Sequence, residues 1–226
     1  MALLRHPRGF DTGAAYIHLA KRDRKLAAWM KRIGPIGPDP RWNQSFDPVD
    51  ALARAILYQQ LSGKAAATIV GRVEAAIGDD RFHCDTLARC DDATIRACGV
   101  SGNKLLALRD LALRESRGEI PDLRQMATMD NEALIAALVP VRGIGRWTVE
   151  MMLMFRLGRP DVLPVDDLGV RKGAQRVDRS DEMLRPKQLQ SRGERWGPYR
   201  TYAALYLWRI ADWTDAAKAP IRRSQD

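Results

Sequence analysis

The sequence is poor in cysteine. Its 226 residues include only Cys84, Cys90 and Cys98, which form no CxxC pair. Three thiolates cannot complete a cluster that needs four within one chain, so we predict neither an iron–sulfur cluster nor a four-cysteine zinc site. So few cysteines are typical of a reducing compartment.

Histidine and long apolar runs are also scarce. His6, His18 and His83 are scattered without a repeated metal-ligand spacing, which argues against a structural or catalytic zinc. No window approaches the ~20 apolar residues of a membrane span, and the N-terminus lacks the apolar core of a signal peptide. We therefore expect a soluble, cytoplasmic protein with no membrane partner. As a separate expectation, the protein is a monomer.

Strand signals are missing as well, because alternating β-branched runs do not occur and alanine and leucine recur at helical intervals. The fold is therefore predicted to be all-α. A hydrophobic content of 46% is enough for a substantial core. Asp47 before Pro48 is a typical helix start. The predicted helices span residues 15–32, 48–61, 64–77, 92–98, 103–117, 131–139, 146–157, 167–176, 185–196 and 199–213.

What the sequence does have is positive charge. Lysine and arginine outnumber aspartate and glutamate by 37 to 28, which gives a formal net charge of +9. A polyanionic partner such as DNA is compatible with this charge, and so is an ordinary solvated basic surface.

The most informative segment, residues 131–173, combines a helix, the turn Gly143-Ile144-Gly145, a second helix and the carboxylate pair Asp166-Asp167. Glycines on both sides of Ile144 allow positive φ and the close approach of a phosphate to backbone amides. Taken alone, Gly-x-Gly is better explained by a tight turn between two helices, and an isolated aspartate pair by helix capping; the two motifs in one segment favour the functional interpretation.

Taken together, these segments resemble a known family. Residues 141–148 (VRGIGRWT) are similar to the hairpin of the helix-hairpin-helix (HhH-GPD) DNA glycosylase superfamily, and residues 163–167 (LPVDD) to its catalytic-aspartate segment. Residues 56–62 (ILYQQLS) and 195–200 (RWGPYR) resemble the 3-methyladenine DNA glycosylase II branch. The similarity covers about residues 45–213.

The resemblance implies an all-α fold with two helical subdomains flanking a DNA-binding cleft, and without the N-terminal β domain of longer bacterial members. We expect one subdomain from residues 1–46 with 164–226. The other spans 47–163 and contains the helix-hairpin-helix at about 131–157.

The resemblance also assigns roles to residues. Asp167 is the expected catalytic carboxylate, which stabilises an oxocarbenium ion, and Asp166 is expected to cap the helix or orient its neighbour. Gln60 is the expected wedge that fills the duplex after a base is flipped, although an amide cap explains it equally well. The expected substrate-binding side chains, for which core packing is the alternative, are Trp147, Trp208, Met151 and Tyr58. Beside Gln60, the expected DNA-binding residues are Arg142, Gly143, Gly145, Arg146 and Thr148. Further candidates for phosphate contacts, or plain solvated charges, are Lys64, Lys104 and Arg200.

Trp147 stands where bifunctional relatives carry a Schiff-base lysine, and an indole cannot attack a sugar, so hydrolysis without strand cleavage is expected. No organic cofactor is expected. The hairpin of the family often holds Na+ or K+ on backbone carbonyls, which here would be those of Val139, Val141 and Ile144.

The predicted function is therefore a monofunctional glycosylase that removes alkylated purines of the 3-methyladenine and 7-methylguanine type from double-stranded DNA. Two alternatives remain at this stage. One is a non-catalytic helix-hairpin-helix DNA-binding protein, and the other is a glycosylase for oxidised or mismatched bases.

Overall fold

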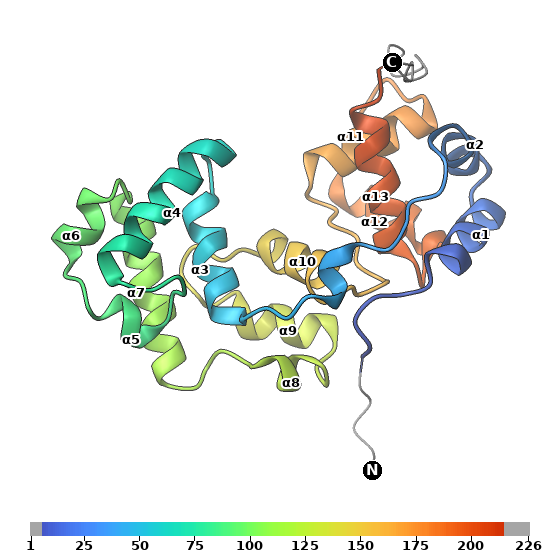
Figure 1. Ribbon diagram of the computed structural model, residues 1–226. Coiled ribbons are helices and arrows are strands. Elements are labelled where there is room, and N and C mark those ends of the chain that lie inside the picture. The colour runs from blue at the N-terminus through green and yellow to red at the C-terminus, as the bar shows by residue number, and fades with distance from the viewer. Residues whose placement is uncertain (1–5, 215–226) are drawn as a thin grey trace, which may run out of the picture. The chain divides into compact units, whose positions relative to one another are not determined.

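The computed structural model describes residues 6–214, and this range contains helices and loops but no strand, which confirms the all-α prediction (Figure 1). The chain folds into two compact units. Unit 1 comprises residues 6–8 and 40–158, and unit 2 comprises residues 9–39 and 159–214.

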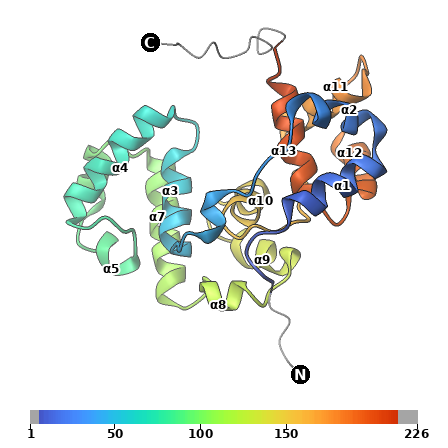
Figure 2. The same cartoon turned by 45° about the vertical axis from the view of Figure 1, so that its right-hand side comes forward.

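Unit 1 is built around α7, which packs against α3, α5 and α6, while α4 packs on α3 and α10 on α9 (Figures 1 and 2). Leu105, Leu108 and Leu111 recur at helical spacing on α7 and are buried, as expected of a core-facing stripe. The helices of unit 1 are η1 (Pro40–Asn43), α3 (Pro48–Tyr58), α4 (Gly63–Ile77), α5 (Cys84–Leu87), α6 (Asp92–Ala97), α7 (Gly102–Ser116), α8 (Leu123–Met126), α9 (Asn131–Leu138) and α10 (Arg146–Phe155).

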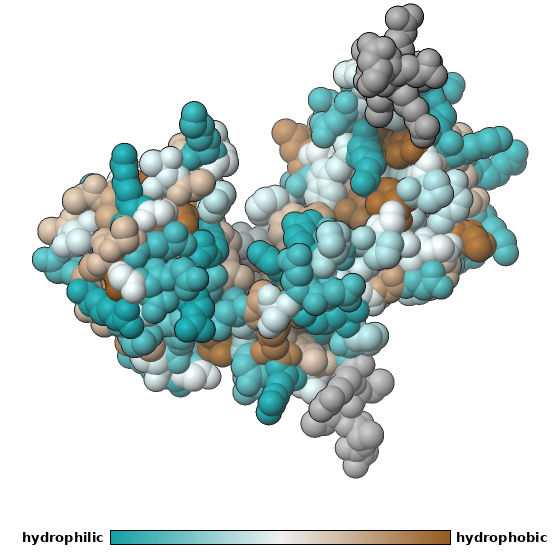
Figure 3. Space-filling view, viewed as in Figure 1, coloured by the Kyte–Doolittle hydropathy of each residue, from teal (hydrophilic) through white to brown (hydrophobic). Residues whose placement is uncertain are grey.

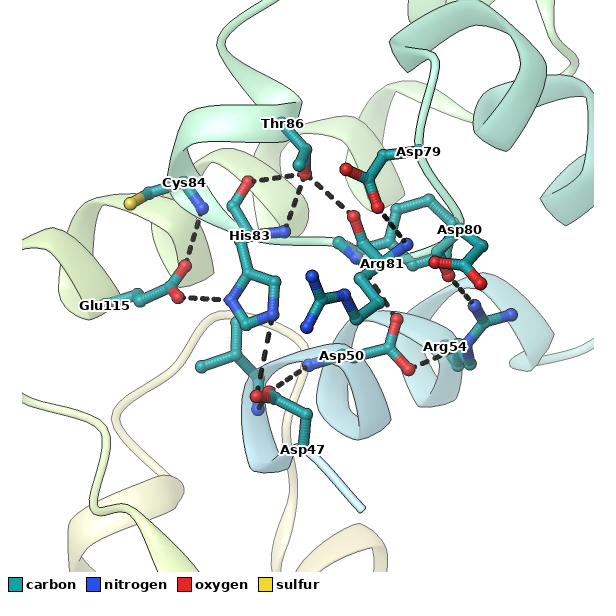
Figure 4. A network of polar contacts seen from close by, with 12 residues as sticks. Asp47, Asp50, Arg54, Asp79, Asp80, Arg81, His83, Cys84, Thr86 and Glu115 are labelled. Carbon is teal, nitrogen blue, oxygen red and sulfur yellow. Dashed lines mark hydrogen bonds and ion pairs between the residues drawn. The ribbon is translucent and has the colours of Figure 1, made fainter. Parts of the chain in front are cut away.

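A polar network holds the start of α5 against α3 and α7 (Figure 4). His83 Nδ1 lies 2.5 Å from Glu115 Oε1, and the Cys84 amide donates to Glu115 Oε2 at 2.6 Å. Burial disfavours the charged imidazole, but the hydrogen bond to Glu115 and the charges of Asp47 and Glu115 outweigh it and raise the pKa of His83. Figure 4 also shows the neighbouring contacts of Arg54, whose guanidinium pairs with Asp50 on its own helix.

Unit 2 is centred on α11 and α13, which pack along each other, with α1 and α2 against them. Val170, Ala174 and Val177 form the buried stripe of α11. The helices of unit 2 are α1 (Thr12–Arg22), α2 (Arg24–Ile33), α11 (Leu168–Asp178), α12 (Pro186–Gly193), η2 (Glu194–Trp196) and α13 (Arg200–Ala211).

The single helix predicted over residues 15–32 is wrong, because Asp23 divides it into α1 and α2. Asp23 adopts an extended conformation and its carboxylate accepts from the Leu26 amide, so it is the N-cap of α2. The carboxylate is buried and also accepts from Arg192 at 2.7 Å and from the Trp196 indole at 2.9 Å. Burial alone raises the pKa of Asp23, but these three donors together lower it.

The predicted subdomain boundaries also need correction. Residues 6–8 and 40–46 belong to unit 1, since the Trp42 indole donates to the Met154 carbonyl at 2.9 Å and Arg8 donates to the Arg156 carbonyl. Residues 159–163 belong to unit 2, where Thr201 Oγ1 donates to the Arg159 carbonyl and accepts from the Val162 amide. These contacts join residues far apart in sequence, so composition does not reveal them.

Hydrophilic side chains cover most of the visible surface of each unit, and hydrophobic ones form separate spots (Figure 3). Among residues 6–214, none of the helices has both the length and the apolar character needed to cross a bilayer.

Candidate functional site

The predicted hairpin is present between α9 and α10. The Val141 amide donates to the Leu138 carbonyl and the Ile144 amide to the Val141 carbonyl, so two successive turns reverse the chain. Ile144 is buried and anchors the loop. Gly143 has φ +78°, and an added Cβ would lie 3.3 Å from Ala107 Cβ, so both backbone conformation and space favour glycine there.

Gly145 serves a different purpose from the predicted one. Its φ is −93°, an ordinary value for any residue, and a Cβ added to it would meet nothing within 4 Å. The expectation that both glycines provide positive φ is therefore wrong for Gly145. As the N-cap of α10 it leaves the first backbone amides of the helix uncovered by a side chain, which is what an anion at a helix N-terminus needs.

Several of the predicted phosphate-binding side chains have partners within the protein. Arg146 forms ion pairs with Glu132 and, at 3.1 Å, with Glu150. Lys104 donates to the Leu57 carbonyl at the end of α3, and Arg200 pairs with Asp161 at 3.0 Å. These contacts give the three side chains structural roles that the sequence did not predict.

The other side chains predicted to contact DNA are exposed or half-buried. The Arg142 side chain is exposed, while its amide donates to Asp110 Oδ2 at 2.8 Å and ties the hairpin to α7. Thr148 is half-buried in the first turn of α10. Lys64 is exposed in the first turn of α4.

The turn between α3 and α4 carries the predicted wedge. Gln60 is exposed and has φ +58°, a left-handed conformation that costs a non-glycine residue roughly 1 kcal/mol or more. Leu61, next to it, is 40% exposed although it is apolar. Sequence reasoning did not predict Leu61 as a site residue. Its exposure beside Gln60 makes it a candidate for DNA contact, and only the structure shows that exposure.

Unit 1 contains a cavity of about 900 Å³ that brings together the predicted substrate-binding residues Tyr58, Trp147 and Met151 and the predicted wedge Gln60. Tyr58 is 43% exposed and Trp147 48% exposed, so neither ring is the core-packing residue that the alternative interpretation requires. Thr148 of the hairpin also lines this cavity.

Sequence reasoning missed other residues of this cavity. Arg41, Phe155 and Arg156 line it, and the Arg41 guanidinium lies 4.4 Å from the centre of the Phe155 ring. Arg41 reaches the site through η1, a short element with no strong periodicity. Only the tertiary structure reveals that it lies near α10.

Asp167 and Trp208 belong to unit 2 and contact each other directly. Asp167 Oδ1 accepts from the Val170 amide at 2.8 Å and from Trp208 Nε1 at 2.8 Å. A Cβ at position 169 would lie 2.7 Å from Trp208 Cδ1, so Gly169 makes room for the indole beside the carboxylate. Trp208 was predicted from the resemblance to bind the substrate. The structure shows in addition that its indole donates a hydrogen bond to Asp167.

The helix-capping role expected of Asp166 belongs to Asp167. Asp167 is the N-cap of α11, whereas Asp166 is exposed and precedes the helix. The reason is geometric, because only the residue directly before the first helical turn can accept from the amide three positions on.

The predicted cation ligands are backbone carbonyls of the hairpin. Val139 is the C-cap of α9, and the Val141 carbonyl accepts one hydrogen bond from the Ile144 amide, which leaves it a second lone pair. No group of three or more histidine, cysteine or acidic side chains within residues 6–214 is arranged to hold a metal.

The chain is similar to known proteins over most of its length. Residues 53–198 match the family described as HhH-GPD superfamily base excision DNA repair protein. The chain is 35% identical over 209 residues to DNA-3-methyladenine glycosylase 1 of Schizosaccharomyces pombe, covering 92% of this chain and 91% of that protein.

Two solved structures are also similar. One is the DNA-3-methyladenine glycosidase of Bacillus halodurans, with a TM-score of 0.80 at 34% identity, covering 92% of this chain and 94% of that one. The other is the 3-methyladenine DNA glycosylase of S. pombe in complex with abasic DNA. Its TM-score is 0.77 at 34% identity, and the match covers 89% of this chain and 98% of that one.

Proposed function

This chain belongs to the HhH-GPD superfamily of base excision DNA repair proteins, and we propose that it is a monofunctional glycosylase that hydrolyses alkylated purines from duplex DNA. The resemblance drawn from its motifs is confirmed for the superfamily and for the 3-methyladenine glycosylase branch. The single observation that supports the proposed chemistry best is the carboxylate of Asp167, fixed by the Val170 amide and the Trp208 indole.

Asp167 supplies the electrostatic part of the reaction. Breaking the N-glycosidic bond builds positive charge on the sugar, and a carboxylate that is already oriented stabilises this charge without reorganising. Two donors on one oxygen hold its orientation. The same carboxylate is suited to orient the attacking water.

The cavity of unit 1 supplies the base pocket. A 3-methyladenine or 7-methylguanine base carries positive charge, so the face of Trp147 attracts it by roughly 1–2 kcal/mol beyond neutral stacking when desolvated. Tyr58 and Met151 complete the apolar surface, and the flexible thioether adapts to bases of different shape. Arg41 and Arg156 repel a cationic base and are suited instead to DNA phosphates.

Hydrolysis without lyase chemistry follows from the residue at position 147. An indole has no nucleophilic amine, so no Schiff base forms with the sugar there. The product is an abasic site in an intact strand. A cationic base departs with little need for protonation, which fits the absence of histidine from the motifs.

DNA binding relies on the hairpin. The amides at the start of α10, together with Thr148 and the exposed Arg142, clamp a phosphate without reading sequence. The carbonyls of Val139, Val141 and Ile144 would hold a Na+ or K+ ion, which adds positive charge beside that phosphate. We also propose that the protein acts as a monomer on double-stranded DNA in the cytoplasm.

The test is single-turnover release of 3-methyladenine from methylated duplex by two neighbouring variants. Asp167→Asn keeps an oxygen that accepts from Val170 and Trp208 but removes the charge, so turnover should fall by on the order of 10²–10³ or more. DNA binding should persist or tighten slightly, because a negative charge has gone. Asp166→Asn is the matched control and should retain substantial activity.

The opposite pattern, an active Asp167→Asn and an inactive Asp166→Asn, would reverse the two roles. If neither substitution slows base release, the catalytic proposal fails. In a separate experiment, base release from a panel of duplexes with alkylated, oxidised or mismatched bases identifies the class of lesion that the protein excises.

A further inference from the structure

Two loops of unit 1 that are proposed to contact DNA are joined by a side chain. Gln59 Nε2 donates to the Gly143 carbonyl at 2.8 Å, although the two residues are 84 positions apart. A carbonyl only accepts hydrogen bonds, so the nitrogen of the Gln59 amide group must face it. The bond connects the turn that carries Gln60 with the apex of the hairpin.

The hairpin end of this bond is rigid. Gly143 has φ +78°, and a Cβ added to it would lie 3.3 Å from Ala107 Cβ of α7, so only glycine fits there without strain. The next residue, Ile144, is buried, and its amide donates to the Val141 carbonyl. The Gly143 carbonyl is therefore a fixed point of unit 1.

The same helix supports both loops. Lys104 of α7 donates to the Leu57 carbonyl at 2.7 Å, just before the turn, and Asp110 of α7 accepts from the Arg142 amide in the hairpin. Helix α7 therefore holds both loops in place from one side. The hydrogen bond of Gln59 joins the two loops directly, next to the exposed residues Gln60 and Arg142.

The residue beside Gln59 depends on this bridge. Gln60 is exposed and left-handed, and a non-glycine residue keeps such a conformation only when its surroundings impose it. Gln59 is the C-cap of α3 and immediately precedes Gln60, so the hydrogen bond to the hairpin holds the backbone from which the Gln60 side chain extends.

We propose that Gln59 is a positioning residue that couples the phosphate clamp to the wedge, so that a phosphate held at the hairpin sets the depth at which Gln60 enters the duplex. This inference rests on the proposed function. Gln59 also lines the cavity proposed as the base pocket, but this role needs no contact between Gln59 and the damaged base. Its contribution is to base extrusion, and not to hydrolysis or to phosphate binding.

The first test is Gln59→Met, which keeps the length of the side chain but removes the donor. Excision of 3-methyladenine from fully paired duplex should slow by about tenfold, while excision from the same lesion opposite a gap should change by less than about twofold, since little pairing has to be broken there. Affinity for undamaged duplex and its salt dependence should remain as in the wild type. Gln190→Met, an exposed glutamine of α12, is the matched control and should behave as the wild type on both substrates.

The second test distinguishes a missing hydrogen bond from a general structural defect. Gln59→Glu places a carboxylate against the Gly143 carbonyl, and only its protonated form can donate there. Relative to the wild type at the same pH, excision from paired duplex by Gln59→Glu should recover as the pH falls from about 7 toward about 5, in the direction of the ordinary pKa of glutamate near 4.3. Gln59→Met should show no such recovery.

Equal slowing of Gln59→Met on paired and gapped substrates, or no slowing on either, would overturn the coupling. A pH-independent defect of Gln59→Glu would do the same. Failure of the proposed function has a different signature, because the wild type would then release no methylated base from either substrate. Fluorescence of 2-aminopurine placed beside the lesion reports extrusion without any base release, so coupling remains measurable in that event.

Discussion

A single oxygen atom links fold and chemistry at Asp167. Its Oδ1 caps α11 through the Val170 amide and accepts from the Trp208 indole, so the carboxylate is oriented before any substrate arrives. Cap and proposed catalyst are therefore the same residue. This explains why the two interpretations of the aspartate pair could not be separated by sequence: both require a carboxylate directly before a helix.

Trp208 provides a prediction at this scale. Trp208→Phe keeps an aromatic face but removes the donor to Asp167, and a hydrogen bond to a charged group contributes about 1.5–3 kcal/mol. The single-turnover rate at saturating enzyme should fall by on the order of 10–100-fold, with a much smaller change in affinity for methylated duplex. Gly169→Ala, which retains Trp208, should also lower the rate, because the added Cβ would displace the Trp208 indole from Asp167. If Trp208→Phe loses affinity but keeps the rate, Trp208 acts by stacking alone.

At the scale of elements, short helices are held by side chains from longer ones. Helix α5 has only four residues, and its N-cap His83 is positioned by Glu115 of α7 and lies near Asp47, the N-cap of α3. A helix this short has little stability by itself. Its position therefore depends on ionisable groups.

The raised pKa of His83 predicts a pH-dependent contribution to stability. The protonated imidazole is favoured in the folded state, so its contribution is complete below the unfolded pKa of about 6.5 and is lost as pH rises through the higher folded pKa. His83→Asn keeps a neutral donor at every pH. The free energy of unfolding lost in His83→Asn, measured with urea, should be larger near pH ~5.5 than near pH ~8.5. A loss that grows with pH would contradict this assignment.

At the scale of the whole molecule, the net charge of +9 and the clamp predict how the protein binds undamaged DNA. Affinity should fall steeply with salt, and each neutralised phosphate contributes ~0.9 to the log–log slope. Gly145→Ala leaves the fold intact, because its Cβ meets no protein atom, but obstructs a phosphate at the start of α10. Titrations between about 50 and 200 mM salt should show weaker binding and a slope lower by ~0.9 for each phosphate that the variant no longer neutralises. An unchanged urea midpoint is the control, and an unchanged slope would remove Gly145 from the clamp.

Much of this protein could be derived from its sequence. Helical periodicity, helix starts such as Asp47-Pro48 and the glycine turn are local features, and local features depend on residues close together in the chain. They were enough to predict an all-α fold and the hairpin, and the family motifs identified five of the residues around the cavity. The same reasoning failed at Asp23, since an aspartate in a basic helical segment looks like a solvated charge until its buried partners, Arg192 and Trp196, are known.

The tertiary structure decided which role each residue plays. Tyr58, Trp147 and Met151 meet at one cavity with Arg41, which no spacing rule connects to them. The hydrogen bond from Gln59 to Gly143 spans 84 positions. Lys104, Arg146 and Arg200, which were predicted to contact phosphates, bind carbonyl or carboxylate groups of the protein itself. The physical reason is the same in each case: periodicity and capping act within a few residues, whereas a hydrogen bond or an ion pair forms wherever folding brings a donor and an acceptor to about 3 Å.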